Sequence, residues 1–216
     1  MDIVGPLTRT SRENRYILTL VDHFTKHAEA YPMPDQEAQT VACAFLNEFV
    51  SRYRVPYVIH TDQGTNFASN LFKEIFKLRG IAKIRTSPYH PQWDGQVEWM
   101  NRTLVELLSL NVPNPPDNWD QDLGLTLMAY RSAVQSFTGF TPYFLLYGKE
   151  MRLPIDIIYR PPSQDLSRTQ FTQEIRLVLE RAYDTARSKV QLSHERQKDY
   201  YDRRTRGERF KPGDSV

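Results

Sequence analysis

The 216-residue sequence has one cysteine, no long apolar run and almost no net charge. Its single Cys43 can neither form a disulfide within the chain nor supply a zinc site of several cysteines. No segment approaches the roughly 20 apolar residues that a membrane-spanning helix requires. Residues 1–6 lack the basic and apolar regions of a secretory signal. These absences exclude disulfide-rich and membrane-spanning classes, so we expect an ordinary globular protein with no membrane partner.

The net charge of +2 comes from 28 Lys and Arg against 26 Asp and Glu, and it is unevenly distributed. Residues 1–150 hold 14 basic and 16 acidic side chains, whereas residues 151–216 hold 14 basic and 10 acidic ones. The excess of +4 in the second part fits either a contact with a polyanion or a solvated helical face. A near-neutral total does not exclude DNA as a partner, because phosphate binding depends on local Lys and Arg side chains.

The spacing of apolar residues predicts an α/β fold in which one mixed sheet is flanked by helices. Runs rich in strand-forming residues predict strands at 1–4, 16–22, 27–33, 57–61 and 81–85. Helical spacing predicts a helix of roughly 15–18 residues capped by Asp35, and further helices over 68–79, from Asp94 onward and over 119–135. We expect Cys43 and Leu71 to lie on buried helix faces.

A change of pattern after these helices divides the chain. Residues 137–162 contain several glycines and prolines, which predict loops. Residues 165–204 then have the pattern of one long helix that is polar on most faces. We therefore predict an α/β core over 1–150, a connector over 151–164 and a long helical arm over 165–206.

Three carboxylates lie at positions that folding alone explains poorly. Asp2 is inside an apolar strand, Asp62 directly follows a buried strand, and Glu98 lies early in a helix on the face expected to pack inward. A half-buried carboxylate costs free energy unless it is paired, hydrogen-bonded or bound to a metal. Converging carboxylates suit hard cations such as Mg²⁺. Two such ions about 3.5–4 Å apart support phosphoryl transfer.

Each of these carboxylates also has a plainer explanation. Asp62 precedes a Gln-Gly pair and fits a turn, in which an Asp side chain accepts from the backbone. Glu98 fits the first turn of a helix, where an acid complements the helix dipole. Asp2 fits an exposed residue near the terminus. On spacing alone, the site and these local explanations stay equally open.

Longer motifs allow comparison with a known family. They are MDIVGPL at 1–7, YILTLVDHFTKHAEAYP at 16–32, HTDQGTNF at 60–67, TSPYHPQWDGQVEWMNRTL at 86–104 and TGFTPYFLLYG at 138–148. In this order they resemble the catalytic core of retroviral-type integrases, most closely those of gypsy-type LTR retrotransposons. The resemblance covers residues 1 to about 150. Residues 207–216 resemble the truncated start of that family's C-terminal β-domain.

The resemblance implies an RNase H-like fold and a metal-dependent polynucleotidyl transferase. The family's Asp-Asp-Glu triad falls on Asp2, Asp62 and Glu98, and 35 residues lie between the last two, as in the family. These carboxylates are the implied ligands of the cofactor, Mg²⁺ or Mn²⁺. The implied reaction is DNA integration: trimming of a 3′ end, followed by attack of the new 3′ hydroxyl on target DNA.

The resemblance also implies partners and a location. Double-stranded DNA, as element ends and as target, would be contacted by Asn66, His90, Gln92, Asn101 and Arg102. For His90 an exposed loop position, and for Arg102 a solvated helix charge, remain the alternatives. The family also implies a homo-oligomer acting in the nucleus, with no small-molecule substrate.

Several departures from the family favour another class of function. Asp2 stands at the second position, so half of the first strand is expected to be missing, and we find no His/Cys zinc domain. Trp93 and Trp99 stand where smaller or polar residues are usual. The alternative is therefore a non-catalytic integrase-derived fragment, or a host-adopted DNA-binding or assembly module. A general nuclease for RNA–DNA hybrids explains neither the 35-residue spacing nor the motif at 86–104.

Overall fold

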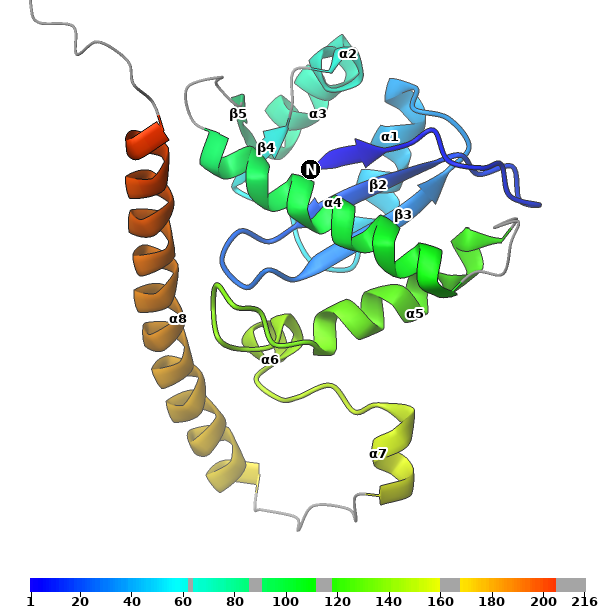
Figure 1. The fold of residues 1–216 in the computed structure, drawn as a ribbon. Coiled ribbons are helices and arrows are strands. Elements are labelled where there is room, and N and C mark those ends of the chain that lie inside the picture. Colours follow the sequence, from blue (N-terminus) through cyan, green and yellow to red (C-terminus); the bar gives the residue numbers. More distant parts are fainter. Residues whose placement is uncertain (62–63, 86–90, 112–117, 160–167, 205–216) are drawn as a thin grey trace, which may run out of the picture.

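The structure is a computed structural model that describes residues 1–61, 64–85, 91–111, 118–159 and 168–204. Figure 1 shows two small groups of strands between helices. The first sheet is antiparallel and consists of β1 (Asp2–Val4), β2 (Tyr16–Val21) and β3 (Ala28–Met33), in that order. The second is parallel and consists of β4 (Val58–Thr61) and β5 (Ala82–Arg85). All five strands predicted from the sequence are present, with boundaries shifted by one residue or so.

The prediction of one continuous sheet is corrected by these two separate ladders. The two sheets meet at the chain start, where the amine of Met1 donates to the carbonyl oxygen of His60 at 2.9 Å. β1 has only three paired residues, and this single bond to β4 does not make a ladder. The strands are nevertheless neighbours, so the start of β1 lies beside β4.

Strand alternation gives β2 two buried faces. Leu18 and Leu20 point into a first core under α1 (Ala38–Ala44), the π-helix η1 (Phe45–Val50), α2 (Thr65–Ala68) and α3 (Asn70–Arg79). Ile17 points into a second core under α4 (Pro91–Asn111) and α5 (Trp119–Ser132). Figure 1 shows α4 and α5 together on one side of the first sheet. The result is a layered α/β fold, as expected.

The remaining helices are α6 (Pro142–Tyr147), α7 (Pro154–Tyr159) and α8 (Arg168–Arg204), and a third, smaller core joins α6 to α8. Leu145 of α6 is fully buried against Ala182 and Ala186 of α8. The hydroxyl of Tyr183 donates to the carbonyl of Leu145 at 2.8 Å. The predicted long helix is thus present as α8 and contacts the rest of the fold through α6. No helix in the described ranges has the length and apolar character needed to cross a membrane.

Several local predictions were wrong. Residues 137–162, predicted as loops, contain α6 and α7. Thr141 caps α6 by accepting from the backbone N–H of Phe144, Pro142 begins the helix, and Gly148 ends it with φ 74°. A Thr-Pro start and a Gly stop enclose only six residues, too short a stretch to show helical periodicity.

The predictions of two helix starts and of the burial of two residues were also wrong. α1 begins after Glu37, not at Asp35, whose carboxylate instead accepts from the N–H of Glu37 at 2.9 Å. The helix expected from Asp94 already starts at Pro91, a residue tolerated in a first turn. Cys43 is exposed and Leu71 is 42% exposed, whereas their neighbours Ala42 and Phe72 are buried in the first core.

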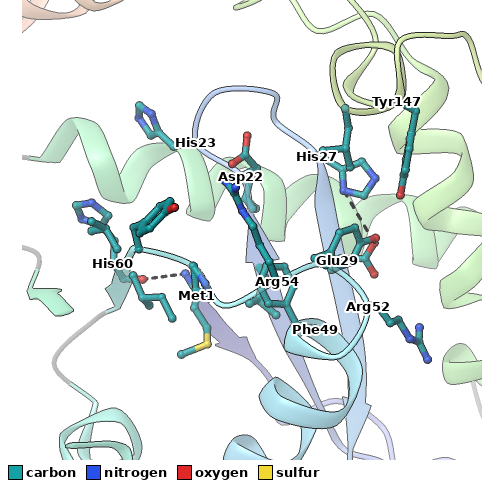
Figure 2. Close-up of a pocket in the computed structure, with 18 residues that line it drawn as sticks. Met1, Asp22, His23, His27, Glu29, Phe49, Arg52, Arg54, His60 and Tyr147 are labelled. Carbon is teal, nitrogen blue, oxygen red and sulfur yellow. Dashed lines mark hydrogen bonds and ion pairs between the residues drawn. The ribbon is translucent and has the colours of Figure 1, made fainter. Parts of the chain in front are cut away.

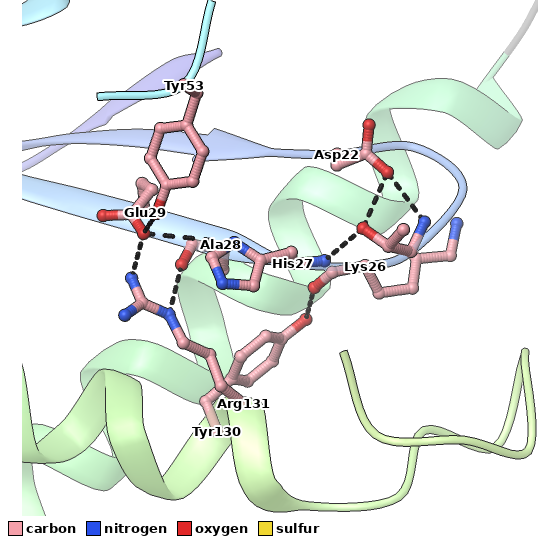
Figure 3. A network of polar contacts seen from close by, with 9 residues as sticks. Asp22, Lys26, His27, Ala28, Glu29, Tyr53, Tyr130 and Arg131 are labelled. Atoms are coloured by element: carbon pink, nitrogen blue, oxygen red, sulfur yellow. Dashed lines mark hydrogen bonds and ion pairs between the residues drawn. The ribbon is translucent and has the colours of Figure 1, made fainter. Parts of the chain in front are cut away.

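A buried ion pair ties α5 to the first sheet (Figure 3). The guanidinium of Arg131 pairs with the carboxylate of Glu29 on β3, and its Nε donates to the carbonyl of Ala28 at 2.9 Å. Tyr53, which follows η1, donates its hydroxyl to the same carboxylate. Burial, together with this bond to Glu29, raises the pKa of Tyr53 above its usual range. The carboxylate of Glu29 therefore connects three segments, which are β3, α5 and the residues after η1.

We expect Arg131→Met to destabilise the fold by about 3–5 kcal/mol, because it leaves the buried carboxylate of Glu29 without its cation. Urea unfolding at pH 7 measures the loss. The matched control is Arg52→Met, which removes an exposed arginine paired with Glu48 and should cost less than about 1 kcal/mol. Equal effects of the two substitutions would contradict the importance of the buried pair.

Candidate functional site

Asp2 is held on both of its carboxylate oxygens. Oδ1 accepts from the backbone N–H of Ile3 at 2.8 Å, and Oδ2 accepts from the side-chain Nδ2 of Asn101 at 2.6 Å. Asp2 of β1 and Asn101 of α4 are 99 positions apart in sequence. Asp2 is half-buried, so its carboxylate is fixed at the edge of the first sheet facing α4. The alternative in which Asp2 is an exposed residue near the terminus is therefore wrong.

Helix α4 is positioned by three buried side chains, Met100, Leu104 and Leu108, which pack on β2 and α5. This apolar stripe decides which residues of α4 face β1. Asn101 reaches Asp2, and Glu98 occupies a position of α4 three residues earlier. Residues three apart lie on one face of a helix. The backbone thus places the Glu98 position on the side of α4 that faces Asp2.

The second predicted carboxylate follows β4. That strand ends at Thr61, whose side chain is 1% exposed, and Met1 is bonded to His60 in the same strand. Asp62 itself and His90 lie outside the described residues. Gln92 lies in the first turn of α4. The end of β4 and the start of β1 are adjacent, since the amine of Met1 is hydrogen-bonded to the carbonyl of His60.

The remaining DNA-contact candidates have different surroundings. Asn101, expected at DNA, instead directs its amide to Asp2. Asn66 is half-buried in α2. Arg102 is exposed, with its Nε 3.9 Å from a carboxylate oxygen of Glu106 one turn later on the same helix. Such a loose surface pair leaves the guanidinium open to solvent.

The donor set at Asp2 is chemically suited to a hard cation. In the described part of the chain, no group of three or more His, Cys, Asp or Glu side chains comes together as a metal site. Asp2 supplies one carboxylate. The buried Oδ1 of Asn101 accepts no hydrogen bond from any described residue. Carboxylate and amide oxygens are ligands that Mg²⁺ and Mn²⁺ accept. The pair therefore has oxygen atoms of the kind that could contribute to a metal site.

A second polar region, not predicted from the sequence, lines a cavity of about 700 Å³ beside β1 (Figure 2). His27 and Glu29 of the β2–β3 hairpin and Tyr147 of α6 lie on one side of it. His23 and His60 lie on the other. A charged Glu29 inside the apolar run 27–33 was the one sequence signal that could have pointed to it.

Burial changes the proton affinities around this cavity. It lowers the pKa of His23 to about 4, with the positive charge of Lys26 adding to the effect. It lowers the pKa of His27 to about 4, with Arg131 adding to it. His27 is therefore neutral at pH 7, and its 3.9 Å approach to Glu29 is not an ion pair at that pH. Burial also lowers the pKa of Lys26 to about 8.

The fold and these residues can now be compared with known proteins. Residues 1–91 match the integrase core domain family. The resemblance to retroviral-type integrases is confirmed. The chain is 27% identical, over 224 aligned residues, to the retrovirus-related Pol polyprotein from transposon 412 of Drosophila melanogaster, in a match that covers 100% of this chain and 18% of that protein.

Retroviral sequences and solved structures give the same result. The Pol polyprotein of Feline endogenous virus ECE1 is 38% identical over 62% of this chain and 13% of its own length. The catalytic core domain of BIV integrase superposes with a TM-score of 0.52 at 26% identity, covering 66% of this chain and 89% of that one. The HTLV-2 integrase core solved with magnesium gives 0.52 at 21% identity, over 66% and 91% of the two chains, and shows a shared fold. The chain spans less than a fifth of the two polyproteins it matches.

We expect stability to fall as the pH drops from about 6.5 to about 4. In that window the histidines of the unfolded chain take up protons, whereas buried His23 and His27 do not, so protons favour unfolding. Each histidine contributes up to about 1.4 kcal/mol per pH unit. Urea unfolding between pH 7 and pH 4.5 measures the slope, which His27→Gln should make shallower. An unchanged slope would show that His27 titrates normally in the folded protein.

Proposed function

We propose that this chain is the catalytic core of a DNA integrase, which transfers DNA strands with the help of Mg²⁺ or Mn²⁺. The observation that carries the proposal is the 2.6 Å bond between Asp2 and Asn101, which places α4 against β1. Asp2, Asp62 and Glu98 are the proposed metal ligands and catalytic residues. The integrase core domain match and the retroviral and transposon relatives support this function.

The proposed reaction has two steps of the same kind. In the first, the oxygen of a water molecule bonds to a phosphorus near the 3′ end of element DNA, and the bond from that phosphorus to a 3′ oxygen breaks. In the second, the freed 3′ hydroxyl attacks a phosphorus of target DNA and displaces another 3′ oxygen. In both, the nucleophile loses its proton to solvent, the departing 3′ oxygen takes up a proton from solvent, and no bond to the protein forms.

The protein's part in these steps is to position groups and neutralise charge. A bound divalent cation would activate the attacking oxygen and stabilise the leaving one. Asp2 holds its place through Asn101, which acts as a positioning residue. Asp62 and Glu98 would complete the ligand set from the end of β4 and from α4. Carboxylates on three separate elements make the site dependent on the whole fold.

DNA and further copies of the chain are the proposed partners. Arg102, which is exposed on α4, is a proposed phosphate contact. Asn66, His90 and Gln92 are the other proposed contacts, whereas Asn101 acts through Asp2. One integrase that shares this fold, at a TM-score of 0.55, was solved as a simian T-cell lymphotropic virus intasome. That likeness supports a homo-oligomer acting on double-stranded DNA as the proposed assembly, and the nucleus is proposed only from the family resemblance.

The proposed organisation follows the chain order. Residues 1–150 form an RNase H-like core, 151–164 a connector, 165–206 a helical arm and 207–216 the start of a β-domain. The layered strands and helices and the fold shared with retroviral integrase cores support the first assignment. The helix α8 supports the third.

A non-catalytic module derived from an integrase is the second candidate function. It is favoured by Trp93 and Trp99, which stand where smaller or polar residues are usual in the family. The two candidates differ in one measurable property, metal-dependent cleavage of DNA.

The double variant Asp62→Asn/Glu98→Gln tests the proposal. We expect it to abolish Mn²⁺-dependent disintegration of a branched DNA substrate while thermal stability stays nearly unchanged, because the ligands are lost and no apolar packing is. Calorimetric titration with Mn²⁺ should show saturable binding to the wild type only. The control Glu74→Gln changes an exposed acid on α3 and should keep full activity. Metal binding without cleavage in the wild type would favour the non-catalytic module, whereas cleavage by the double variant would contradict the roles of Asp62 and Glu98.

Asn101→Ala tests the positioning role. Loss of the amide that holds Asp2 should raise the Mn²⁺ concentration needed for half-maximal cleavage by about 10–100-fold. Thermal unfolding should change little, since the buried stripe of α4 is kept. Asn47→Ala, at an exposed position of η1, is the control and should leave the metal requirement unchanged. A wild-type metal requirement in Asn101→Ala would refute the role.

A further inference from the structure

The long helix α8 is attached to the core along one narrow face. Ala182 and Ala186 are the only buried side chains in the described part of this helix, and both pack on Leu145 of α6. Gly148 allows the close approach, because a Cβ there would lie 3.0 Å from the side chain of Leu179. With so little apolar surface buried, α8 should separate from the fold at a lower cost in free energy than the opening of the two larger cores.

The β2–β3 hairpin supplies a second attachment for α8. Figure 1 shows this hairpin pointing toward the helix. Phe24 at its tip lies edge-on to Tyr183, with ring centroids 5.4 Å apart. The preceding residue, His23, lies against His194, with ring centroids 6.1 Å apart and an angle of 15° between the ring planes. Since His194 is about three helical turns beyond Tyr183, the hairpin contacts α8 over that length.

Positive charge lies beside the His23–His194 pair. Lys26 of the same hairpin is 5% exposed, and its Nζ donates to the carbonyl of His23 at 2.6 Å. Asp22 is the one acid in the sequence of the hairpin turn 22–27, and its Oδ1 already accepts two hydrogen bonds within that turn, both at 2.7 Å. From β4, His60 also acts on His23 electrostatically.

The neighbours of His194 on α8 supply little negative charge to offset this. Lys198 is exposed one turn later, and the side chain of Lys189 lies over the turn that follows α5. Glu195 is exposed, and its carboxylate accepts from Gln191 on its own helix at 3.4 Å. A proton taken up by either histidine of the pair would therefore be placed next to cations.

Burial keeps both histidines neutral while α8 is attached. It lowers the pKa of His23 to about 4, with the charges of Lys26 and His194 adding to the effect. It also lowers the pKa of His194, again with Lys26 adding to it. Separation of α8 from the hairpin would return both rings to water, where the pKa of histidine is about 6.5. Protons therefore favour the separated state as the pH falls from about 6.5 toward about 4.

We propose that the His23–His194 contact is a proton-sensitive attachment, which holds α8 on the core at neutral pH and releases it in acid. Neither of the two larger cores contains a residue of α8, so both can stay intact when the helix separates. Release would also change where residues 205–216, which follow α8 in the sequence, lie relative to the core. The inference stands apart from DNA integration, because it involves none of the proposed metal ligands.

A thiol-labelling experiment measures the release. Ala186→Cys places a thiol in the contact between α6 and α8, where a disulfide reagent reaches it only when the helix separates. The native Cys43 is exposed and serves as a reference in the same molecule, so the ratio of the two labelling rates cancels the pH dependence of thiol chemistry. Between pH 7.5 and pH 5 we expect this ratio to rise by up to roughly 30-fold through His23 alone, and further through His194.

Two substitutions test whether these histidines cause the rise. The double variant His23→Gln/His194→Gln, made in the Ala186→Cys chain, removes both titrating groups and should keep the ratio constant within about threefold over the same pH range. The matched control is His27→Gln, because His27 lies in the same hairpin but faces Tyr53 and Tyr147 instead of α8. The control should retain the full rise.

A second thiol position separates release of α8 from unfolding of the core. Ala42→Cys places a thiol in the first core, and it should label at least roughly tenfold more slowly than the thiol of Ala186→Cys at pH 5. Equal labelling at the two positions would show that the whole fold opens, and would overturn the proposal. So would a constant ratio in the chain with native histidines, or a rise that persists in the double variant. None of these measurements uses DNA or metal, so they are independent of the integrase test.

Discussion

The burial of β2 on both of its faces is the constraint on which the rest of the fold depends. Ile17, Leu18 and Thr19 are fully buried, so this strand must be covered by helices on either side. On one side α1, η1 and α3 supply the cover, and on the other α4 and α5. The second requirement brings α4 across β1, and with it Asn101 to Asp2. The candidate site is therefore a consequence of how the sheet is buried.

The same arrangement buries charged side chains, which costs free energy unless they are paired. Glu29 follows the inward alternation of β3 and must be paired, which Arg131 and Tyr53 accomplish from two other elements. Half-buried His23 and buried Lys26 and His27 lie within the same hairpin, and burial lowers the pKa of all three. The hairpin thus contains several polar side chains. It lies beyond the end of β1, on the other side of Met1 from Asp2. It stabilises the fold rather than forming part of the proposed catalytic centre.

The candidate site and the cavity meet at the first residues of the chain. Met1 bonds to β4, Asp2 bonds to α4, and the cavity begins where Met1 ends the ladder. Order in β1 decides how firmly Asp2 is held, and metal ligands need firm placement. The two candidate functions, an active core and a non-catalytic module, differ in whether DNA is cleaved.

The sequence by itself determined the order of strands and helices, because alternation and helical spacing are local properties of apolar residues. It also determined the family resemblance, through long motifs such as those at 16–32 and 86–104, and the candidate roles of Asp2 and Glu98. Short α6 was missed because one and a half turns show no periodicity. The exposure of Cys43 and Leu71 was missed because packing chooses among several apolar residues on one helix side. Only the tertiary structure decided that Asn101 holds Asp2, that Glu29 pairs with Arg131, and that His194 lies against His23. Each of these joins residues far apart in the chain, and local sequence carries no information about which distant partner satisfies a buried polar group.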